Sequence, residues 1–187
     1  MSALPLTPSQ TVGPFLHIAL SWEDGPFVVP EGTAGAIWLR GRILDGAGDP
    51  VPDGLVETWQ ADADGGLDHM VDAPDDRATD SFRGFGRCPT GPRGDWAMLT
   101  RKPGAVPGTD GQPQAPYVDV SVFARGLLNR LVTRIYFADE TDANRVDPVL
   151  RSVPERRRHT VLAEPTGDGY HLDIRLQGEH ETVFFAV

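Results

Sequence analysis

Glycine and proline are so frequent in this chain that long helices are excluded. Of its 187 residues, 21 are Gly and 17 are Pro, which is about a fifth of the chain against roughly 12% in average composition. Proline breaks the interior of a helix and glycine weakens it, so the chain must turn often. A hydrophobic content of 40% still supplies enough apolar side chains for one packed core. The sequence therefore predicts a single domain that spans residues 1–187 and is built from short elements.

Apolar residues recur with a period of two in several segments, which is typical of β-strands. The clearest case is residues 117–123, where Val118, Val120 and Val122 share one face of the strand. Further strands are expected at residues 36–44, 54–60, 95–102, 130–138, 159–163, 170–176 and 182–186. Seven or eight short strands separated by turns predict an all-β fold, a two-sheet β-sandwich with long loops around one core. Of the connections, residues 61–94 are expected to be irregular and residues 141–158 to hold one or two short helical turns.

The first 34 residues differ from the rest of the chain because they are rich in Pro, Gly, Thr and Ser. They contain one apolar stretch, Phe15–Leu20, which we expect to form a short strand or part of a docking arm. Apolar side chains of this kind need a surface to cover. We therefore expect residues 1–34 to form an N-terminal arm that docks on a partner chain.

The charge balance excludes several classes of function. With 17 Lys+Arg against 27 Asp+Glu the net charge is −10, which disfavours nucleic acid because phosphate binding depends on clustered cations. The apolar runs are too short to span a membrane. A secretory signal requires a Lys or Arg near its start, but neither residue precedes Arg40. The single Cys88 cannot form an internal disulfide. We expect a cytoplasmic protein that binds neither nucleic acid nor membranes.

Local motifs alone indicate little chemistry. The chain has no G-x-S-x-G, P-loop or dinucleotide-binding motif. His171 and Asp173 lie two residues apart on an expected strand, so they share a face and could offer two ligands to a divalent ion. Two ligands are too few for a site, and a structural role is the alternative. The acidic segment 62–68 has Leu67 where a calcium loop needs Gly, which favours an ordinary turn.

Six short segments form a recognisable pattern through their order and spacing. They are residues 7–15 (TPSQTVGPF), 56–62 (VETWQAD), 84–87 (GFGR), 102–104 (KPG), 133–137 (TRIYF) and 175–179 (RLQGE). Together they resemble the intradiol ring-cleavage dioxygenases over about Thr7 to Phe185. The resemblance implies a β-sandwich domain and a part in opening an aromatic ring with O2.

Catalytic members of that family hold a ferric ion with two Tyr and two His. The resemblance places hydrocarbon side chains at all four ligand positions: Leu67, Val106, Val118 and Val120. Such side chains have no lone pair for a metal, and β-branched residues on one strand face suit packing instead. The resemblance therefore implies a chain with no metal and no catalytic residue of its own, whose homologous β chain holds the Fe(3+).

The same resemblance implies a substrate and a way of binding it. This chain and the iron-bearing β chain would form αβ units within a higher oligomer and cleave protocatechuate with O2 to 3-carboxy-cis,cis-muconate. The substrate-binding residues implied for this chain are Thr11, Gly13, Pro14 and Arg134. A guanidinium suits the carboxylate of this small aromatic acid because it can donate two parallel hydrogen bonds. Gly13 permits close approach of the backbone, and Pro14 fixes the chain direction.

Two alternatives belong to other functional classes. In the first, the chain is a non-catalytic β-sandwich scaffold or interaction subunit that never contacts substrate, and Arg134 forms an ordinary ion pair. In the second, it is an autonomous metal enzyme that uses His171, Asp173 and a third residue. Iron bound to the isolated chain would favour the second alternative.

Overall fold

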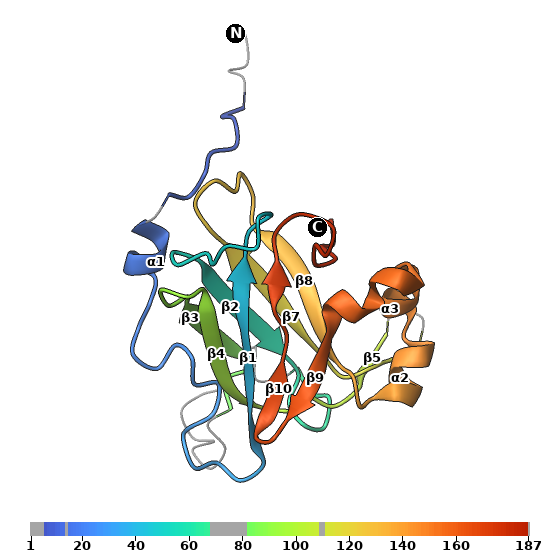
Figure 1. Ribbon diagram of the computed structural model, residues 1–187. Coiled ribbons are helices and arrows are strands. Elements are labelled where there is room, and N and C mark those ends of the chain that lie inside the picture. Colours follow the sequence, from blue (N-terminus) through green and yellow to red (C-terminus); the bar gives the residue numbers. More distant parts are fainter. Residues whose placement is uncertain (1–5, 14, 68–81, 109–110, 187) are drawn as a thin grey trace, which may run out of the picture.

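The computed structural model describes residues 6–13, 15–67, 82–108 and 111–186. Strands dominate the fold and the helices are short (Figure 1). The longest helical element has seven residues, and none of the described helices is long and apolar enough to cross a membrane. In chain order the elements are α1 (Phe15–Ala19), β1 (Ala36–Leu44), β2 (Leu55–Gln60), β3 (Phe85–Pro89), β4 (Asp95–Arg101), β5 (Val106–Pro107), β6 (Pro113–Gln114), β7 (Tyr117–Phe123), β8 (Leu131–Phe137), α2 (Thr141–Val146), α3 (Pro148–Ser152), η2 (Glu155–Val161), β9 (Leu162–Thr166), β10 (Gly169–His171) and β11 (Ile174–Arg175).

Most of the strands follow one hydrogen-bonded path, β11-β1-β10-β9-β8-β7-β2-β3, and β4 pairs with β1. The element β9 joins the two halves of this path, because it pairs in parallel with β8 and antiparallel with β10. The mostly β character is thus confirmed. The predicted division into two sheets is not clearly confirmed, since the bonds along both edges of β9 create one large mixed sheet that is nearly barrel-shaped (Figure 1).

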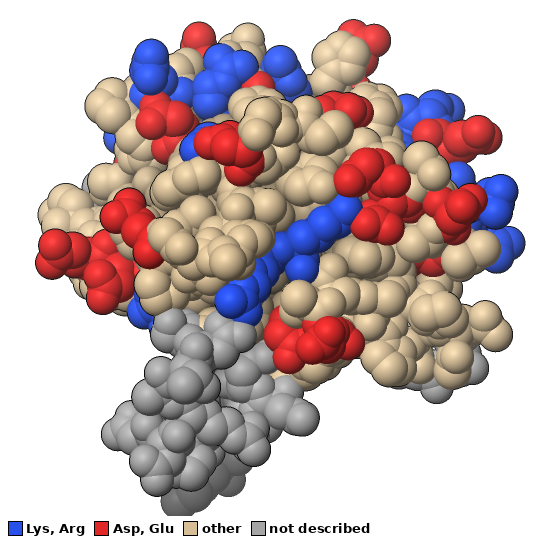
Figure 2. Space-filling view, turned by 90° about the horizontal axis from the view of Figure 1, so that it is seen from below, with Lys and Arg blue, Asp and Glu red and all other residues tan. Residues whose placement is uncertain are grey.

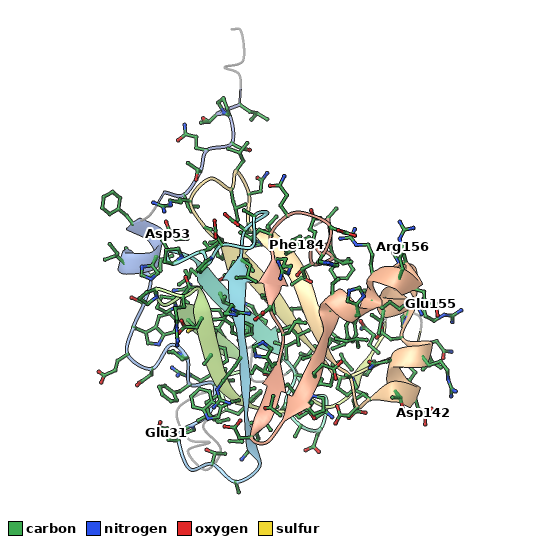
Figure 3. The ribbon with its side chains drawn as sticks, viewed as in Figure 1. Glu31, Asp53, Asp142, Glu155, Arg156 and Phe184 are labelled. Atoms are coloured by element: carbon green, nitrogen blue, oxygen red, sulfur yellow. The ribbon has the colours of Figure 1, made fainter. Side chains whose placement is uncertain are left out.

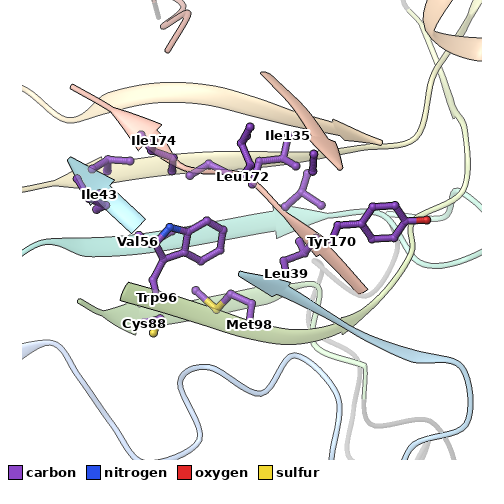
Figure 4. Close-up of a cluster of buried hydrophobic side chains, with 14 of the residues drawn as sticks. Leu39, Ile43, Val56, Cys88, Trp96, Met98, Ile135, Tyr170, Leu172 and Ile174 are labelled. Atoms are coloured by element: carbon purple, nitrogen blue, oxygen red, sulfur yellow. The ribbon is translucent and has the colours of Figure 1, made fainter. Parts of the chain in front are cut away.

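The main core lies where side chains of β1, β4, β10 and β11 meet those of β2, β7 and β8 (Figure 4). The valine face of β7 is part of it, because Val118, Val120 and Val122 are each 0% exposed. Burying one such side chain contributes roughly 1.5–3 kcal/mol. The core residues labelled in the close-up are Leu39, Ile43, Val56, Cys88, Trp96, Met98, Ile135, Tyr170, Leu172 and Ile174.

The opposite face of β7 and β8 is covered in part by the helices. Tyr136 of β8 packs there with Ala115, Leu150 and Val161 in a second apolar cluster. The fully buried carboxylate of Asp147 accepts hydrogen bonds from the backbone N–H groups of Ala115 and Leu150 and from the Tyr136 hydroxyl. These bonds fix α3 against the sheet. The rest of this outer face stays open to solvent.

Many surface charges are paired with an opposite charge. In the view from below, Lys and Arg side chains lie beside groups of Asp and Glu side chains (Figure 2). Lys102, the one lysine of the chain, places Nζ 2.6 Å from Glu140 Oε1 and 3.0 Å from Asp139 Oδ2. The guanidinium of Arg40 donates to both carboxylate oxygens of Asp168.

Several expected elements are confirmed closely. The strands expected at residues 36–44 and 117–123 coincide with β1 and β7. Those at 54–60, 95–102 and 130–138 differ from β2, β4 and β8 by one residue at one or both ends. The helical turns expected within residues 141–158 are α2, α3 and the beginning of η2.

Towards the C-terminus the expected strands are displaced. The 3-10 helix η2 occupies most of residues 159–163, so β9 begins only at Leu162. The strand expected at residues 170–176 is interrupted between β10 and β11. Residues 182–186 form no strand but a segment without regular secondary structure beside the start of β8, where the N–H of Phe185 donates to the carbonyl of Val132 at 2.8 Å. Because β9 pairs only with the C-terminal end of β8, the first residues of β8 are free to bond to this segment.

Two expectations nearer the N-terminus are wrong. The apolar stretch Phe15–Leu20 contains the short helix α1, so the strand alternative fails. The stretch expected to be irregular contains β3. The sequence suggests that Gly86 lies in a turn, but it lies within β3. A Cβ there would lie 2.8 Å from Val28 Cγ2 and 2.9 Å from Met98 Sδ. Glycine at this position serves close packing within a strand.

Candidate functional site

A groove of about 550 Å³ lies on the open outer face of β2, β7 and β8. Two rows of side chains, set by the strand register, form its floor. The rows are Trp59, Asp119 and Arg134 in one and Glu57, Ser121 and Val132 in the other. Its walls come from Val149 of α3, from Phe185 of the C-terminal segment and from Arg130, which directly precedes β8. The groove therefore combines parts of the chain that are far apart in sequence.

Strand alternation explains which side chains reach this groove. Successive residues of a strand point to opposite faces, and β7 alternates strictly between buried and half-buried positions. Val118 and Val120 consequently face the core, while Asp119 and Ser121 face the groove. The pattern that predicted the core of this sheet also predicts its outer face.

Arg134 is held firmly in the groove. Its Nε donates to Asp119 Oδ1 at 3.0 Å, and its Nη1 donates to Gln114 Oε1 at 2.8 Å. The guanidinium carbon lies 3.8 Å from the centroid of the Tyr117 ring, a cation–π geometry. The side chain of Arg134 is only 18% exposed. These contacts fix its orientation and leave part of the guanidinium fork to donate elsewhere.

Burial influences both charges of the Arg134–Asp119 pair. For Arg134, burial works to lower the pKa, but interactions with Tyr136 and Asp119 outweigh it, so the pKa lies above its ordinary value. Arg134 is therefore a permanent cation. For Asp119, burial raises the pKa by more than the attraction of Arg134 lowers it. The ion pair thus lies in a partly desolvated environment, where charge interactions are stronger than in bulk water.

Trp59, which lines the groove, belongs to a group of stacked aromatic side chains. Trp59 packs against Phe85 with ring centroids 4.5 Å apart, and Phe85 stacks on Trp22 at 6.0 Å. Arg87 lies 4.9 Å above the Trp22 ring, and its Nε donates to Glu57 Oε1 at 2.7 Å. The carboxylate of Glu57 is therefore neutralised by a cation outside the groove.

The arm residues expected to bind substrate lie apart from the groove. Thr11 is exposed, and its Oγ1 accepts a hydrogen bond from the N–H of Gly126 at 2.7 Å. Gly13 has a φ of 70°, and a Cβ there would meet nothing within 4 Å. Pro14 lies outside the described residues. Figure 1 shows this part of the arm beside the loop between β7 and β8, away from the sheet, so Thr11 and Gly13 do not line the groove with Arg134.

The four positions that the resemblance assigns to iron ligands do not fit a ferric ion. Val118 and Val120 are fully buried, Val106 of β5 is 7% exposed, and Leu67 is an exposed loop residue. A ferric ion needs oxygen or nitrogen donors, and none of these side chains carries one. Three of the four instead contribute to apolar packing.

His171 and Asp173 meet, but as parts of an ion-pair network. His171 Nε2 lies 3.0 Å from Asp173 Oδ1. Asp173 also accepts from the backbone N–H of Arg42 at 2.9 Å and from its Nη2 at 2.7 Å. Within the described ranges, no three His, Cys, Asp or Glu side chains are grouped to hold a metal ion. The carboxylate of Asp173 is thus engaged in holding β1.

Sequence reasoning found Arg134 but missed most of its surroundings. Trp59 and Asp119 could have been assigned to the groove from strand alternation once β2, β7 and β8 were known to be neighbours. Val149 and Phe185 gave no such signal, because their approach depends on how α3 and the C-terminal segment pack. Strand order and helix docking are long-range properties of the fold.

Comparison with known proteins extends these observations. Residues 29–178 match the sequence model of a family described as dioxygenase. The chain is 40% identical to the protocatechuate 3,4-dioxygenase alpha chain of Pseudomonas putida, over 97% of this chain and 96% of the relative. It is 35% identical to the corresponding alpha chain of Burkholderia cepacia over the full length of both. The beta chain of the Burkholderia cepacia enzyme is 36% identical over 78% of this chain and 66% of its own length.

Solved structures show the same fold. The dioxygenase domain of a carbohydrate-binding fusion protein from Streptomyces sp. SirexAA-E superposes with a TM-score of 0.58 at 24% identity, covering 92% of this chain and 98% of that domain. An intradiol ring-cleavage dioxygenase from Tetranychus urticae gives a TM-score of 0.57 at 17% identity, covering 95% and 97%. At these identities the superpositions establish the fold alone.

Proposed function

Since this chain belongs to the intradiol ring-cleavage dioxygenase family, we propose that it acts as an alpha-type chain of a protocatechuate 3,4-dioxygenase. Together with a homologous beta chain it opens protocatechuate with O2 between the two hydroxyl-bearing carbons, and the product is 3-carboxy-cis,cis-muconate. The observation that carries this proposal is the similarity to two alpha chains, at 40% and 35% identity, over nearly the whole length of each.

In this proposal the ferric ion belongs to the beta chain. The support is the donor chemistry of this chain, because Leu67, Val106, Val118 and Val120 offer no lone pair at the four expected ligand positions. A relative that is itself a beta chain supports the existence of such a partner. This chain then performs no redox step, and its part is to bind and orient the substrate.

Arg134 holds the carboxylate of the substrate in this proposal. The guanidinium is a permanent cation on the outer face of the sheet, opposite the face that carries Val118 and Val120. A substrate in the groove therefore touches this chain from outside, and the beta chain closes over it. Trp59 and Phe185, which line the same groove, help to exclude water from the ion pair and so strengthen it.

The N-terminal arm has a docking role in the assembly. Leu6, Phe15 and Ile18 are 95%, 75% and 68% exposed, and so many exposed apolar side chains on one segment indicate a surface that another chain covers. With the arm docked on a neighbouring chain, Thr11, Gly13 and Pro14 contribute to a substrate pocket between chains. The αβ units assemble into a higher oligomer in the reducing cytoplasm.

One observation favours a second candidate, an iron-free scaffold that never touches substrate. Arg134 already donates to Asp119 and Gln114, as an ordinary structural arginine does. In that case the groove is only a contact surface for the partner chain. The two candidates differ in whether substrate kinetics respond to changes in the groove.

Oxygen uptake with protocatechuate tests the proposal. We expect uptake when this chain is co-expressed with a homologous beta chain from the same organism, and none from this chain alone. Changes of Arg134 should then alter protocatechuate kinetics. Full activity of the beta chain without this chain would contradict the proposal, and kinetics indifferent to Arg134 in an intact complex would favour the scaffold.

A further inference from the structure

The groove contains one positive charge that no carboxylate in it neutralises. Of its two acidic side chains, Glu57 is paired with Arg87, and Asp119 is paired with Arg134. Arg130 also lines the groove. It has no hydrogen-bond or ion-pair partner among the residues that the structure describes. The pairs cancel locally, so the net attraction that this groove exerts on an anion comes from Arg130.

The position of Arg130 lets it act together with Arg134. Residues 130, 132 and 134 share one face of the chain at β8, because alternate residues of an extended segment point the same way. Four residues of extended chain separate the two arginines by about 13 Å along the backbone. Val132 lies between them on the groove floor. Two long side chains can therefore approach one small anionic ring above an apolar residue from both sides.

The two arginines differ in how they are held. Arg134 is fixed by Asp119, Gln114 and the Tyr117 ring. Arg130 is exposed, and no described contact fixes its guanidinium. A fixed, neutralised arginine provides geometry, whereas a free one provides charge that an incoming carboxylate can engage without displacing a partner.

We infer that Arg130 is a specificity-determining residue that selects catechols bearing a carboxylate over uncharged catechols. This inference rests on the proposed function. In a chain with a net charge of −10, an anionic substrate is repelled at long range, and an uncompensated local cation offsets that repulsion. Arg130 attracts the carboxylate, and Arg134 orients it.

The test uses the purified complex of this chain with its beta chain. Arg130→Gln should raise the KM for protocatechuate about tenfold or more, the scale of a lost charge-assisted hydrogen bond, with kcat nearly unchanged. For catechol, which lacks the carboxylate, the KM or the competitive inhibition constant should stay within about twofold. Arg130→Lys keeps the charge and should restore most of the affinity. Raising the ionic strength should weaken protocatechuate binding more in the unaltered complex than in Arg130→Gln.

Arg156→Gln is the matched control, because it changes the net charge by the same amount. Arg156 is exposed on η2, and its side chain points outward there (Figure 3). An equal rise in KM for the Arg130 and Arg156 variants would reduce the effect to overall charge and overturn the inference. An unchanged KM for Arg130→Gln, or dissociation of its complex in size-exclusion chromatography, would overturn it as well.

The experiment separates this inference from the proposed function. If Arg134→Gln raises the KM for protocatechuate and Arg130→Gln does not, Arg130 has no role in selection and the proposed function stands. If the beta chain is equally active without this chain, the proposed function itself fails.

Discussion

Arg134 and Asp119 lie directly opposite each other on β8 and β7, and the Nε of Arg134 donates to Oδ1 of Asp119 at 3.0 Å. The two neighbours of Arg134 in sequence, Thr133 and Ile135, point into the interior, because successive residues of a strand face opposite sides. A slip of one residue between the two strands would turn Arg134 into the apolar core. Packing of the core therefore decides that this cation faces the groove.

Replacing Arg134 with Ala in the αβ complex should mainly weaken binding of protocatechuate. If its bond to the carboxylate is desolvated, the loss corresponds to roughly 2–5 kcal/mol, measured as an increase in KM from oxygen-uptake kinetics. Asp119→Asn is the matched control, because it removes the negative partner but leaves the guanidinium in the groove. Protocatechuate kinetics that do not change in Arg134→Ala would remove this residue from the substrate pocket.

Placing a histidine at Val120 should destabilise the chain. Val120 is 0% exposed in the core, and the larger imidazole would overpack this site at a cost of about 1–3 kcal/mol. Val120→Ala, which only removes two methyl groups, should cost about 2 kcal/mol. Urea denaturation of both variants measures the difference. A histidine variant at least as stable as the alanine variant would mean that this strand face tolerates a polar ligand.

Asp147→Ala should be among the more damaging single substitutions in the helical region. The carboxylate accepts from the backbone N–H groups of Ala115 and Leu150 and from the Tyr136 hydroxyl, and all three donors would lose their partner inside the protein. The expected loss is about 3 kcal/mol in the free energy of unfolding. Asp142→Ala on α2 is a suitable control, since Asp142 is 91% exposed and its loss should cost almost nothing.

The decrease in the free energy of unfolding at acidic pH should depend on Asp173. Burial works to raise the pKa of Asp173, but hydrogen bonds from the side chain and backbone of Arg42 outweigh it and lower the pKa below its ordinary value. A carboxyl group with a lowered pKa in the folded state stabilises the protein above the unfolded pKa, near 3.9, and this stabilisation is lost as the pH falls through the folded pKa.

In Asp173→Asn the free energy of unfolding should therefore be lower at neutral pH and should fall less steeply below about pH 4. Denaturation midpoints measured between neutral and strongly acidic pH test this. Parallel curves for the variant and the unaltered chain would show that Asp173 titrates alike in both states.

Gly41→Ala should destabilise the sheet strongly. A Cβ on Gly41 would overlap the carbonyl oxygen of Leu172, so the backbone between β10 and β11 would have to move away from β1. The expected loss in the free energy of unfolding is about 1–3 kcal/mol, the usual cost of overpacking. Gly167→Ala is the control, because a Cβ there meets nothing within 4 Å. Equal thermal unfolding midpoints for the two variants would contradict the close approach of Leu172 to β1.

Local regularity made much of the fold predictable. The alternation in residues 36–44 and 117–123 identified β1 and β7 fully, because a strand at a core must repeat its apolar residues every second position. It failed at residues 159–163, where η2 runs into β9, because a short 3-10 helix and a short strand can share one composition. It also missed β3, whose Gly86 is selected by neighbours from other strands.

By itself the sequence determined two properties of this protein. Its side chains at the four expected ligand positions cannot hold iron, because hydrocarbons have no lone pair, and no arrangement of the backbone changes that. Its alternation of residues also decided which side of β7 and β8 is apolar. Only the tertiary structure decided what meets on the other side: β9 joins both halves of the sheet, and α3 and the C-terminal segment leave an open groove. Arg134 is paired there, while Arg130 has no partner in the part of the chain that the structure describes. Those outcomes depend on contacts between distant segments, which no local pattern encodes.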